Sequence, residues 1–398
     1  MPQSLSDWKK VLAPLDVNIL RPDRIVRGRE PRIAAERLML FFESGKNLKR
    51  YLSEAAGYTP NTGQAEDISA CLRQARELLR LATSAELMTK PIILYYGMAS
   101  LAKALVLSLG CPRRLASLPN KHGLRVPSRY SLPMADLEVG VEGKDGLFHG
   151  FVNALDQLAG VPVSVSLGRV FISLAGAIGA SDLGSLRATM KDLLLRIVGV
   201  EDFLRDTFTE APLNAVLTHV ELQYCDKTNW HPRMTLVFTL PKGTNAEWLI
   251  ALHPRLKDWR VDAADETGVN LVNLPSALPV RLSPDEEGPL FRPLYQLLMP
   301  LARGPSDELR LVGAVEGLTI PEPAIQLAAM FLLSSIARYR PDLWSVFSSF
   351  SPDHESLQLR ALLEAVFDRA LTSYPLQVLA ALGRTGIQVW EGRTIMFA

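Results

Sequence analysis

Apolar positions are densest between residues 91 and 109, where they cover nearly the whole circumference of a helix. Pro91 stands where a first helical turn tolerates proline, and Gly110 and Pro112 stand where helices commonly end. A helix that lacks a polar face must be covered on most of its sides. The pattern therefore predicts a buried helix over 91–109.

Two helices with a single apolar face are predicted before this one. The first opens at Pro31 and places four apolar side chains on one face: Ala34, Leu38, Phe41 and Phe42. The second covers 65–84, where apolar residues recur three or four positions apart. Because the links between them are short, we expect these three helices to form one antiparallel bundle.

The pattern changes from residue 124 onward, where glycine, proline and serine become frequent. Short runs that alternate between apolar and polar residues are typical of strands with one buried face. Strands are predicted at 161–167, 170–172, 215–224, 233–240, 269–274, 278–282 and 309–315. A return to helical spacing predicts helix over 185–208.

The end of the chain is helical again. A helix over 324–338 has few polar positions, and Ser351-Pro352 precedes a further helix. Residues 387–397 predict a hairpin that turns at Glu391-Gly392. Because neither 91–109 nor 324–338 has a polar face, we expect these two helices to be buried against each other.

These elements predict an α+β, mostly helical fold. In it, the N- and C-terminal helices form a common core around a β-containing middle region. The regions are 1–123, which is helical; 124–318, which contains the strands with one or two helices; and 319–398, which is helical with a terminal hairpin. A chain of 398 residues is long enough for such a division.

Composition and charge indicate a soluble, cytoplasmic protein. Apolar residues make up 48% and charged residues 21%, as in globular proteins. The net charge of +1 gives no overall attraction to nucleic acid or to an anionic membrane, so any such attraction must be local. The three cysteines are far apart in sequence, which is typical of free thiols in a reducing compartment. Residues 91–111 are long enough to cross a bilayer, but Lys103 near their middle favours a core helix, and no membrane partner is expected.

Familiar catalytic and cofactor motifs are absent from the sequence. It contains no phosphate-binding P-loop, no dinucleotide-binding glycine motif, no zinc-protease motif, no nucleophile elbow and no Cys-x-x-Cys pair. Its six histidines are scattered singly, so neither a metal site nor a cofactor is expected. The sequence favours a protein that is not an enzyme, with His122 as the candidate if there is a catalytic residue.

One stretch departs from the balanced charge of the rest. From Leu87 to Ala135 the chain has seven lysines and arginines and no aspartate or glutamate. Its loop portion is a candidate site for nucleic acid or another polyanion. The residues of that candidate site are Arg113, Arg114, Lys121, His122, Arg125 and Arg129. The alternative is that distant acids, such as Asp285, Glu286 and Glu287, neutralise this stretch in the fold.

His122 allows two interpretations. It lies beside Lys121 with no acid nearby in sequence, so the pKa of its imidazole is expected below the free value. A neutral ring there either acts as a base towards a ligand or ties the loop to the backbone, with Gly123 supplying the turn. Changing His122 to alanine separates the two interpretations, since a loop anchor loses stability together with function.

Two further pairs have both structural and functional interpretations. Tyr95 and Tyr96 either stack on a base or lie in the core with their hydroxyls hydrogen-bonded. Arg338 and Arg340 follow a buried helix, where they are expected to satisfy its C-terminal carbonyls.

Four segments together resemble the YaaC-like bacterial proteins. They are 90–105, 121–124, 146–148 and 335–344, and the resemblance spans the chain from the helix at Pro31 to the helix near Leu379. It implies a cytoplasmic bacterial protein organised as one unit, and it implies no activity.

The helices 65–84 and 91–109 also resemble, more distantly, those of the helical HEPN superfamily, whose ribonucleases pair an arginine with a histidine four to six residues later. The chain lacks that spacing, because Arg114 and His122 are separated by seven residues. The milder implication is RNA binding without cleavage.

Three classes of function follow. The preferred one is a nucleic-acid-associated protein that binds RNA or DNA through the basic loop. The alternatives are a non-enzymatic interaction subunit of a bacterial complex, for example in phage defence, and a HEPN-like nuclease that uses His122. A protein partner or a homo-oligomer is compatible with each of the three.

Overall fold

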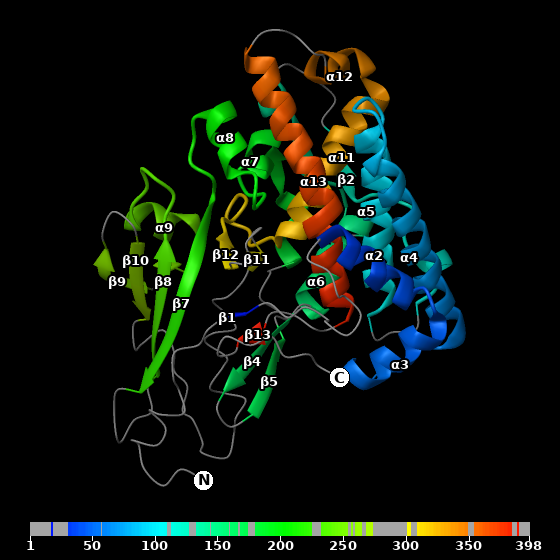
Figure 1. The fold of residues 1–398 in the computed structure, drawn as a ribbon, viewed down its shortest axis with the longest axis horizontal. Helices are drawn as coiled ribbons and strands as arrows, with labels where there is room; N and C mark the ends of the chain where they lie inside the picture. Colours follow the sequence, from blue (N-terminus) through cyan, green and yellow to red (C-terminus); the bar gives the residue numbers. More distant parts are fainter. Residues whose placement is uncertain are drawn as a thin grey trace.

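The computed structural model describes residues 17–18, 31–56, 58–109, 113–126, 133–143, 145–158, 160–165, 168–173, 180–224, 232–253, 256–257, 259–264, 268–273, 301–303, 309–348, 354–383 and 388–389. Figure 1 shows a body of long helices with β-sheets beside and below it. The predicted α+β class, with N- and C-terminal helices in one core, is confirmed by the packing described below.

Four helices open the described chain: α2 (Pro31–Phe42), α3 (Gly45–Ala56), α4 (Thr62–Thr83) and α5 (Lys90–Leu107). The three predicted helices are confirmed as α2, α4 and α5, and α3 is an additional one. Asn61 caps α4, because its side chain accepts a hydrogen bond from the Gln64 amide at 2.9 Å.

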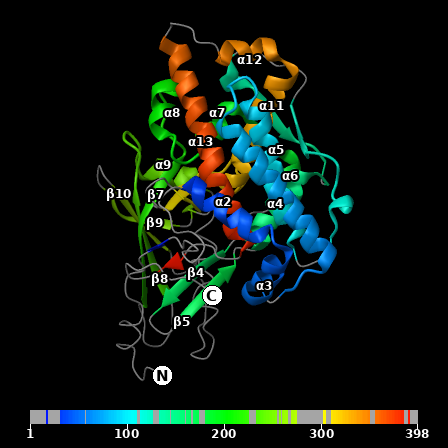
Figure 2. The same cartoon turned by 45° about the vertical axis from the view of Figure 1, so that its right-hand side comes forward.

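Helix α5 lies at the centre of the helical body. It contacts α4 on one side and α6, α11 and α13 on the others, as Figures 1 and 2 show. Leu94, Met98 and Leu101 are completely buried. Lys90–Leu107 is also the one described helix with the length and apolar character of a membrane span, and 72% of it is buried inside the protein.

The predicted contact between the two most apolar helices is confirmed. Every residue from Glu322 to Ala337 in α11 (Glu322–Tyr339) is buried. The rings of Phe331 on α11 and Tyr95 on α5 lie 5.5 Å apart. Residues from opposite ends of the chain therefore share one core.

Two further helices complete this core. The long α13 (His354–Leu382) contacts α2, α5 and α8, and its Tyr374 hydroxyl donates to the Met98 carbonyl of α5 at 2.9 Å. Pro341 opens α12 (Pro341–Ser348). The indole of Trp344 in α12 donates to the Leu87 carbonyl at 3.2 Å, which holds α12 on the link between α4 and α5.

The described strands form three sheets. The first has the order β2-β3-β6, the second β1-β13-β4-β5 and the third β11-β12-β7-β8-β10-β9. All described strand pairs are antiparallel except β13 with β4. The strands are β1 (Val17–Asn18), β2 (Leu124–Arg125), β3 (Glu138–Val141), β4 (Gly160–Val165), β5 (Gly168–Ser173), β6 (Arg187–Thr189), β7 (Asn214–Tyr224), β8 (Pro232–Thr239), β9 (Trp259–Ala264), β10 (Gly268–Asn273), β11 (Leu301–Arg303), β12 (Leu309–Val312) and β13 (Gln388–Val389).

Most predicted strands are confirmed, as β4, β5, β7, β8, β10 and β12. The predicted strand at 278–282 lies outside the described residues. The predicted hairpin at 387–397 also lies mostly outside them, and its described part, β13, pairs with β1 on one side and β4 on the other.

The prediction of helix over 185–208 is wrong for part of that stretch. The chain forms β6, then the short α7 (Met190–Leu194), and after a break α8 (Glu201–Phe208). Thr189 and Asp192 form a reciprocal capping box that starts α7 after the strand. Gly199, with φ of 89°, interrupts the helical path between α7 and α8. With α6 (Leu147–Leu158) and α9 (Ala246–Leu252), the middle region has four described helices where one or two were predicted.

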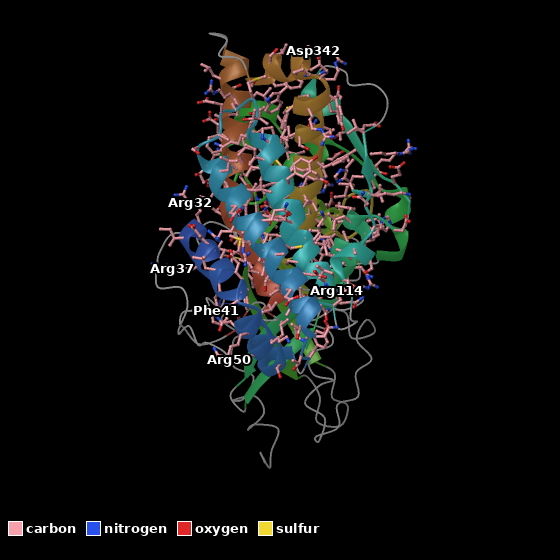
Figure 3. The ribbon with its side chains drawn as sticks, turned by 90° about the vertical axis from the view of Figure 1, so that its right-hand side faces the viewer. Arg32, Arg37, Phe41, Arg50, Arg114 and Asp342 are labelled. Carbon is pink, nitrogen blue, oxygen red and sulfur yellow. The ribbon has the colours of Figure 1, made fainter. Side chains whose placement is uncertain are left out.

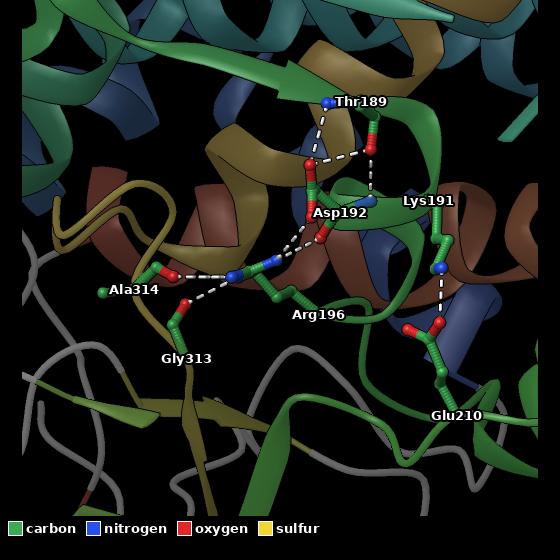
Figure 4. Close-up of polar contacts among 7 residues, drawn as sticks. All are labelled: Thr189, Lys191, Asp192, Arg196, Glu210, Gly313 and Ala314. Atoms are coloured by element: carbon green, nitrogen blue, oxygen red, sulfur yellow. Dashed lines mark hydrogen bonds and ion pairs between the residues drawn. The ribbon is translucent and has the colours of Figure 1, made fainter. Parts of the chain in front are cut away.

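A buried arginine joins this middle region to the segment that leads into α11. The Arg196 guanidinium donates to the carbonyls of Gly313 and Ala314, at 3.1 Å and 2.6 Å, and to the Asp192 carbonyl at 2.6 Å. Figure 4 shows these contacts beside the Thr189–Asp192 cap. Burial lowers the pKa of Arg196, and the carbonyl oxygens around it compensate for lost hydration.

Candidate nucleic-acid interface

The basic loop is tied to the start of α4 by Arg114. Its Nε lies 2.6 Å from Asp67 Oδ2, and the Leu115 amide donates to the same carboxylate oxygen at 2.9 Å. The hydrogen bond from Arg114 lowers the pKa of Asp67. Figure 3 shows Arg114 in the lower half of the helical body and Asp342 at its upper end. Arg114 therefore positions the loop in addition to any contact it makes with a ligand.

The other end of the loop closes onto the start of α6. The amides of Leu147 and Phe148 donate to the carbonyls of Lys121 and His122, both at 2.9 Å. Gly123 has φ of +76°, and a Cβ there would lie 2.9 Å from the Cα of Gly146. A side chain at Gly123 would therefore strain the turn and meet the opposite backbone.

His122 is held against the core helices by this closure. Its Nδ1 lies 2.7 Å from the Tyr95 hydroxyl, and its ring is 5.4 Å from the Tyr95 ring and 5.7 Å from the Phe331 ring. The residue is exposed on its outer side, whereas its contact with the Tyr95 hydroxyl is partly buried. Its second ring nitrogen, Nε2, has no hydrogen-bond partner within the described part of the chain.

The pKa of His122 is lowered, which confirms the predicted direction. Burial is the largest cause, followed by the positive charges of Arg338 and Lys103. No described carboxylate contributes to this shift. Burial also raises the pKa of Tyr95, so that its hydroxyl is neutral. At neutral pH the pair is therefore an uncharged imidazole beside an uncharged phenol, in a positive local field.

Arg338 is the unexpected member of the cluster, and the prediction that it satisfies helix carbonyls is wrong. Its guanidinium donates to the hydroxyls of Tyr96 and Tyr339, and it lies 4.5 Å from the centre of the Tyr339 ring. Arg340 likewise turns to a carboxylate, with its Nε 2.9 Å from Asp342 Oδ1.

The two neighbouring tyrosines of α5 differ: Tyr95 is a core residue, whereas Tyr96 lies at the surface, where it can contact a ligand. Tyr95 is 3% exposed and lies in the core with its hydroxyl bonded, as the structural interpretation predicts. Tyr96 is 39% exposed and Tyr339 is 60% exposed, and both contact Arg338. We call Tyr96, Arg338 and Tyr339 the tyrosine–arginine cluster.

Three candidate cations of the basic loop remain at the surface. Arg113, Lys121 and Arg125 are exposed, and none has an ion pair with a described acid. Arg129 and the acids Asp285, Glu286 and Glu287 lie outside the described residues, so the predicted neutralisation stays a prediction.

A fourth cation comes from the sheet that follows the loop. Arg125 in β2 is paired with Gly140 in β3, which in turn is paired with Arg187 in β6. Directly paired residues point to the same face of a sheet, so the two arginines flank a position without a side chain. Glu138 lies on the same face, one row further along. Sequence reasoning missed Arg187 because its segment was taken as helix.

The described residues contain no group of three or more histidines, cysteines, aspartates or glutamates that is placed to hold a metal ion. Cys71 is a buried free thiol, and burial raises its pKa to about 11. The chemistry that these residues offer is therefore cationic and aromatic.

The fold and the site define a class: a mostly helical α+β protein that carries an exposed cationic and aromatic surface over its central helices. The chain belongs to the YaaC-like protein family, whose model matches residues 40–382. The four segments that carried the resemblance meet in space, because 121–124 contacts 146–148 and the helix ending near Arg338 contacts α5. Comparisons with curated proteins and with solved structures give no match.

Proposed function

We propose that this chain is a cytoplasmic nucleic-acid-associated protein that binds phosphates through the basic loop and the arginines beside it. The observation that carries the proposal is the group of exposed cations on the loop and the adjoining sheet: Arg113, Lys121, Arg125 and Arg187 form no ion pair with a described acid. Burial lowers the pKa of the neighbouring His122, and the positive charges of Arg338 and Lys103 lower it further. In a chain with a net charge of +1, such a group of cations attracts phosphate groups locally.

The cations divide by role. Arg113, Lys121, Arg125 and Arg187 are exposed and lack ion pairs to described acids, so their charges are available to phosphates. Arg114 already donates to Asp67, so that its first effect is on the position of the loop. A charge reversal at Arg114 would set two carboxylates against each other and disturb the loop as well as the charge.

The test is therefore made at Lys121 and Arg125. We expect the variant with Lys121→Glu and Arg125→Glu to bind a labelled single-stranded RNA or DNA of about 20 nucleotides at least tenfold more weakly, measured by fluorescence anisotropy at low salt. Exposed loop positions contribute little to stability, so the melting temperature should stay nearly constant.

A matched control carries the same change of charge on α3. Lys46 and Arg50 are both exposed there, and Figure 3 shows Arg50 at the lower end of the helical body. The variant with Lys46→Glu and Arg50→Glu should keep most of the affinity. Equal losses in the two variants, or no binding by the native protein, would overturn the proposal.

A second candidate function, RNA cleavage, is favoured by the state of His122. Its ring is neutral at pH 7, its Nε2 is without a described partner, and Arg338 supplies positive charge nearby. In the tautomer in which Nδ1 donates to the Tyr95 oxygen, Nε2 can accept the proton of a ribose 2′-hydroxyl. Attack of that oxygen on the phosphorus forms a cyclic phosphate and releases the 5′ oxygen, which takes a proton from solvent.

Cleavage of RNA in the presence of a chelator, with no cleavage of DNA and none by His122→Ala, would establish this second function. Intact RNA after prolonged incubation with stoichiometric native protein would exclude it and leave the binding function in place.

A further inference from the structure

We propose that the tyrosine–arginine cluster is a base-stacking site, and that the nucleic acid bound by this chain is single-stranded. This inference rests on the proposed function and adds to it the class of ligand. It is carried by the aromatic groups at the end of α11, whereas the proposed function is carried by the charges of the loop.

The first step is the exposure of the aromatic rings. Three large aromatic side chains are exposed in the described part of the chain: Tyr96, Phe203 and Tyr339. Two of the three, Tyr96 and Tyr339, gather around one arginine. They lie at the end of a helix whose residues from Glu322 to Ala337 are all buried, so the exposure begins where the buried part of α11 stops.

The second step is the state of Arg338. Its partners are two tyrosine hydroxyls and the Tyr339 ring, and no described carboxylate is among them. A purely structural arginine in the last turn of a helix donates to the helix carbonyls or pairs with an acid, as Arg340 does with Asp342. Arg338 instead lies at the surface, where its hydrogen bonds fix the orientation of the two tyrosines.

The third step is the position of the cluster relative to the loop. The Tyr96 ring lies 5.6 Å from the Tyr95 ring, and the Tyr95 ring lies 5.4 Å from the ring of His122. His122 follows Lys121 and precedes the strand that carries Arg125. We therefore expect a backbone bound at Lys121 to lie within reach of Tyr96. Only an unpaired base can turn from such a backbone onto a ring, because duplex bases are stacked inside the helix.

The experiment separates bases from phosphates. Three labelled probes are compared by anisotropy at low salt: a fifteen-residue oligothymidylate, an abasic oligomer with the same number of phosphates, and a duplex of the same length. We expect the native protein to bind oligothymidylate about tenfold more tightly than the abasic oligomer, in keeping with the usual effect of one stacked base. Tyr339→Leu should remove that difference and leave the affinity for the abasic oligomer unchanged.

Phe203→Leu is the matched control, since Phe203 is an exposed aromatic residue on α8, and it should keep the difference. Tyr339 is more than half exposed, so its replacement should fold, and a melting curve checks this. Equal binding of oligothymidylate and abasic oligomer by the native protein would overturn the stacking site and leave the phosphate-binding function standing. Tighter binding of the duplex than of oligothymidylate would also overturn the stacking site and leave the phosphate-binding function standing. Failure to bind any of the three probes, or an RNA of the same length, would overturn both proposals.

Discussion

The two ends of α11 each carry an ionisable side chain, and the surroundings of the two side chains are opposite. At the N-terminal end, Glu322 is 1% exposed and accepts hydrogen bonds from the Val198 amide, Gln326 and Gln377. At the C-terminal end, Arg338 is exposed, and its partners among the described residues are tyrosine hydroxyls and a ring. The carboxyl group is surrounded by groups that satisfy it within the fold, and the guanidinium lies at the surface without a described acid partner.

The difference distinguishes a structural polar group from a functional one. A buried carboxylate loses hydration and is tolerated because polar groups from several elements replace the lost water. An exposed arginine with no acid partner needs no such replacement, and its presence among exposed tyrosines adds little to stability. We therefore assign Glu322 to the fold and Arg338 to the interface.

The largest effect is expected at Glu322. Glu322→Leu leaves the Val198 amide and the Gln326 amide group without their acceptor, takes one of two acceptors from Gln377, and removes the carboxyl group near Arg369. The free energy of unfolding, measured by urea denaturation, should fall by about 3–5 kcal/mol. Glu364→Leu, on the exposed face of α13, is the control and should change it by less than about 0.5 kcal/mol. Similar small changes in both variants would contradict the assignment of Glu322 as a structural residue.

The contribution of Glu322 to stability is expected to depend on pH. Burial is the largest influence on this carboxyl and raises its pKa above its ordinary value of about 4.5. The folded state then holds a proton that the unfolded state has released, so the stability from this group is fully present below about pH 4.5 and decreases as pH rises through the folded pKa. Glu322→Gln should flatten that part of the stability curve, and an unchanged curve would contradict the assignment.

An intermediate effect on stability is expected at Tyr95 and His122, the pair that joins the core to the basic loop. Tyr95→Phe removes the hydroxyl bonded to His122, and the free energy of unfolding should fall by about 1 kcal/mol. In the native protein, NMR titration of the His122 ring should give a midpoint below 6.5, because burial, Arg338 and Lys103 all oppose its charge. Stability from this group is present above pH 6.5 and decreases as pH falls below it. A midpoint above 6.5 would mean that an acid outside the described residues reaches the ring.

The smallest effect on stability is expected at Arg338. Arg338→Gln should change the free energy of unfolding by less than about 0.5 kcal/mol, since the side chain is exposed. The same variant should bind oligothymidylate more weakly, because it loses the charge in the tyrosine–arginine cluster. A loss of 2 kcal/mol or more in urea denaturation would place Arg338 with Glu322 as a structural residue.

The sequence predicts α4, α5 and α11 because their signal is local: each spacing of apolar residues can be recognised within a few turns. The tyrosine–arginine cluster has no such signal, since Tyr96 and Arg338 are 242 positions apart and only the contact between α5 and α11 brings them together. Arg187 was missed for a different reason. Its strand is three residues long and directly precedes a capped helix, so helical spacing dominates the pattern.

The central claim is that the basic loop contacts phosphates, and the salt dependence of binding tests it most directly. Each phosphate contact to a single strand contributes about 0.7 to the slope of log affinity against log salt concentration. We predict a steep slope for the native protein, and a slope smaller by about 1.4 for the variant with Lys121→Glu and Arg125→Glu, corresponding to two lost contacts. Binding that does not respond to salt, or an identical slope in this variant, would contradict the account.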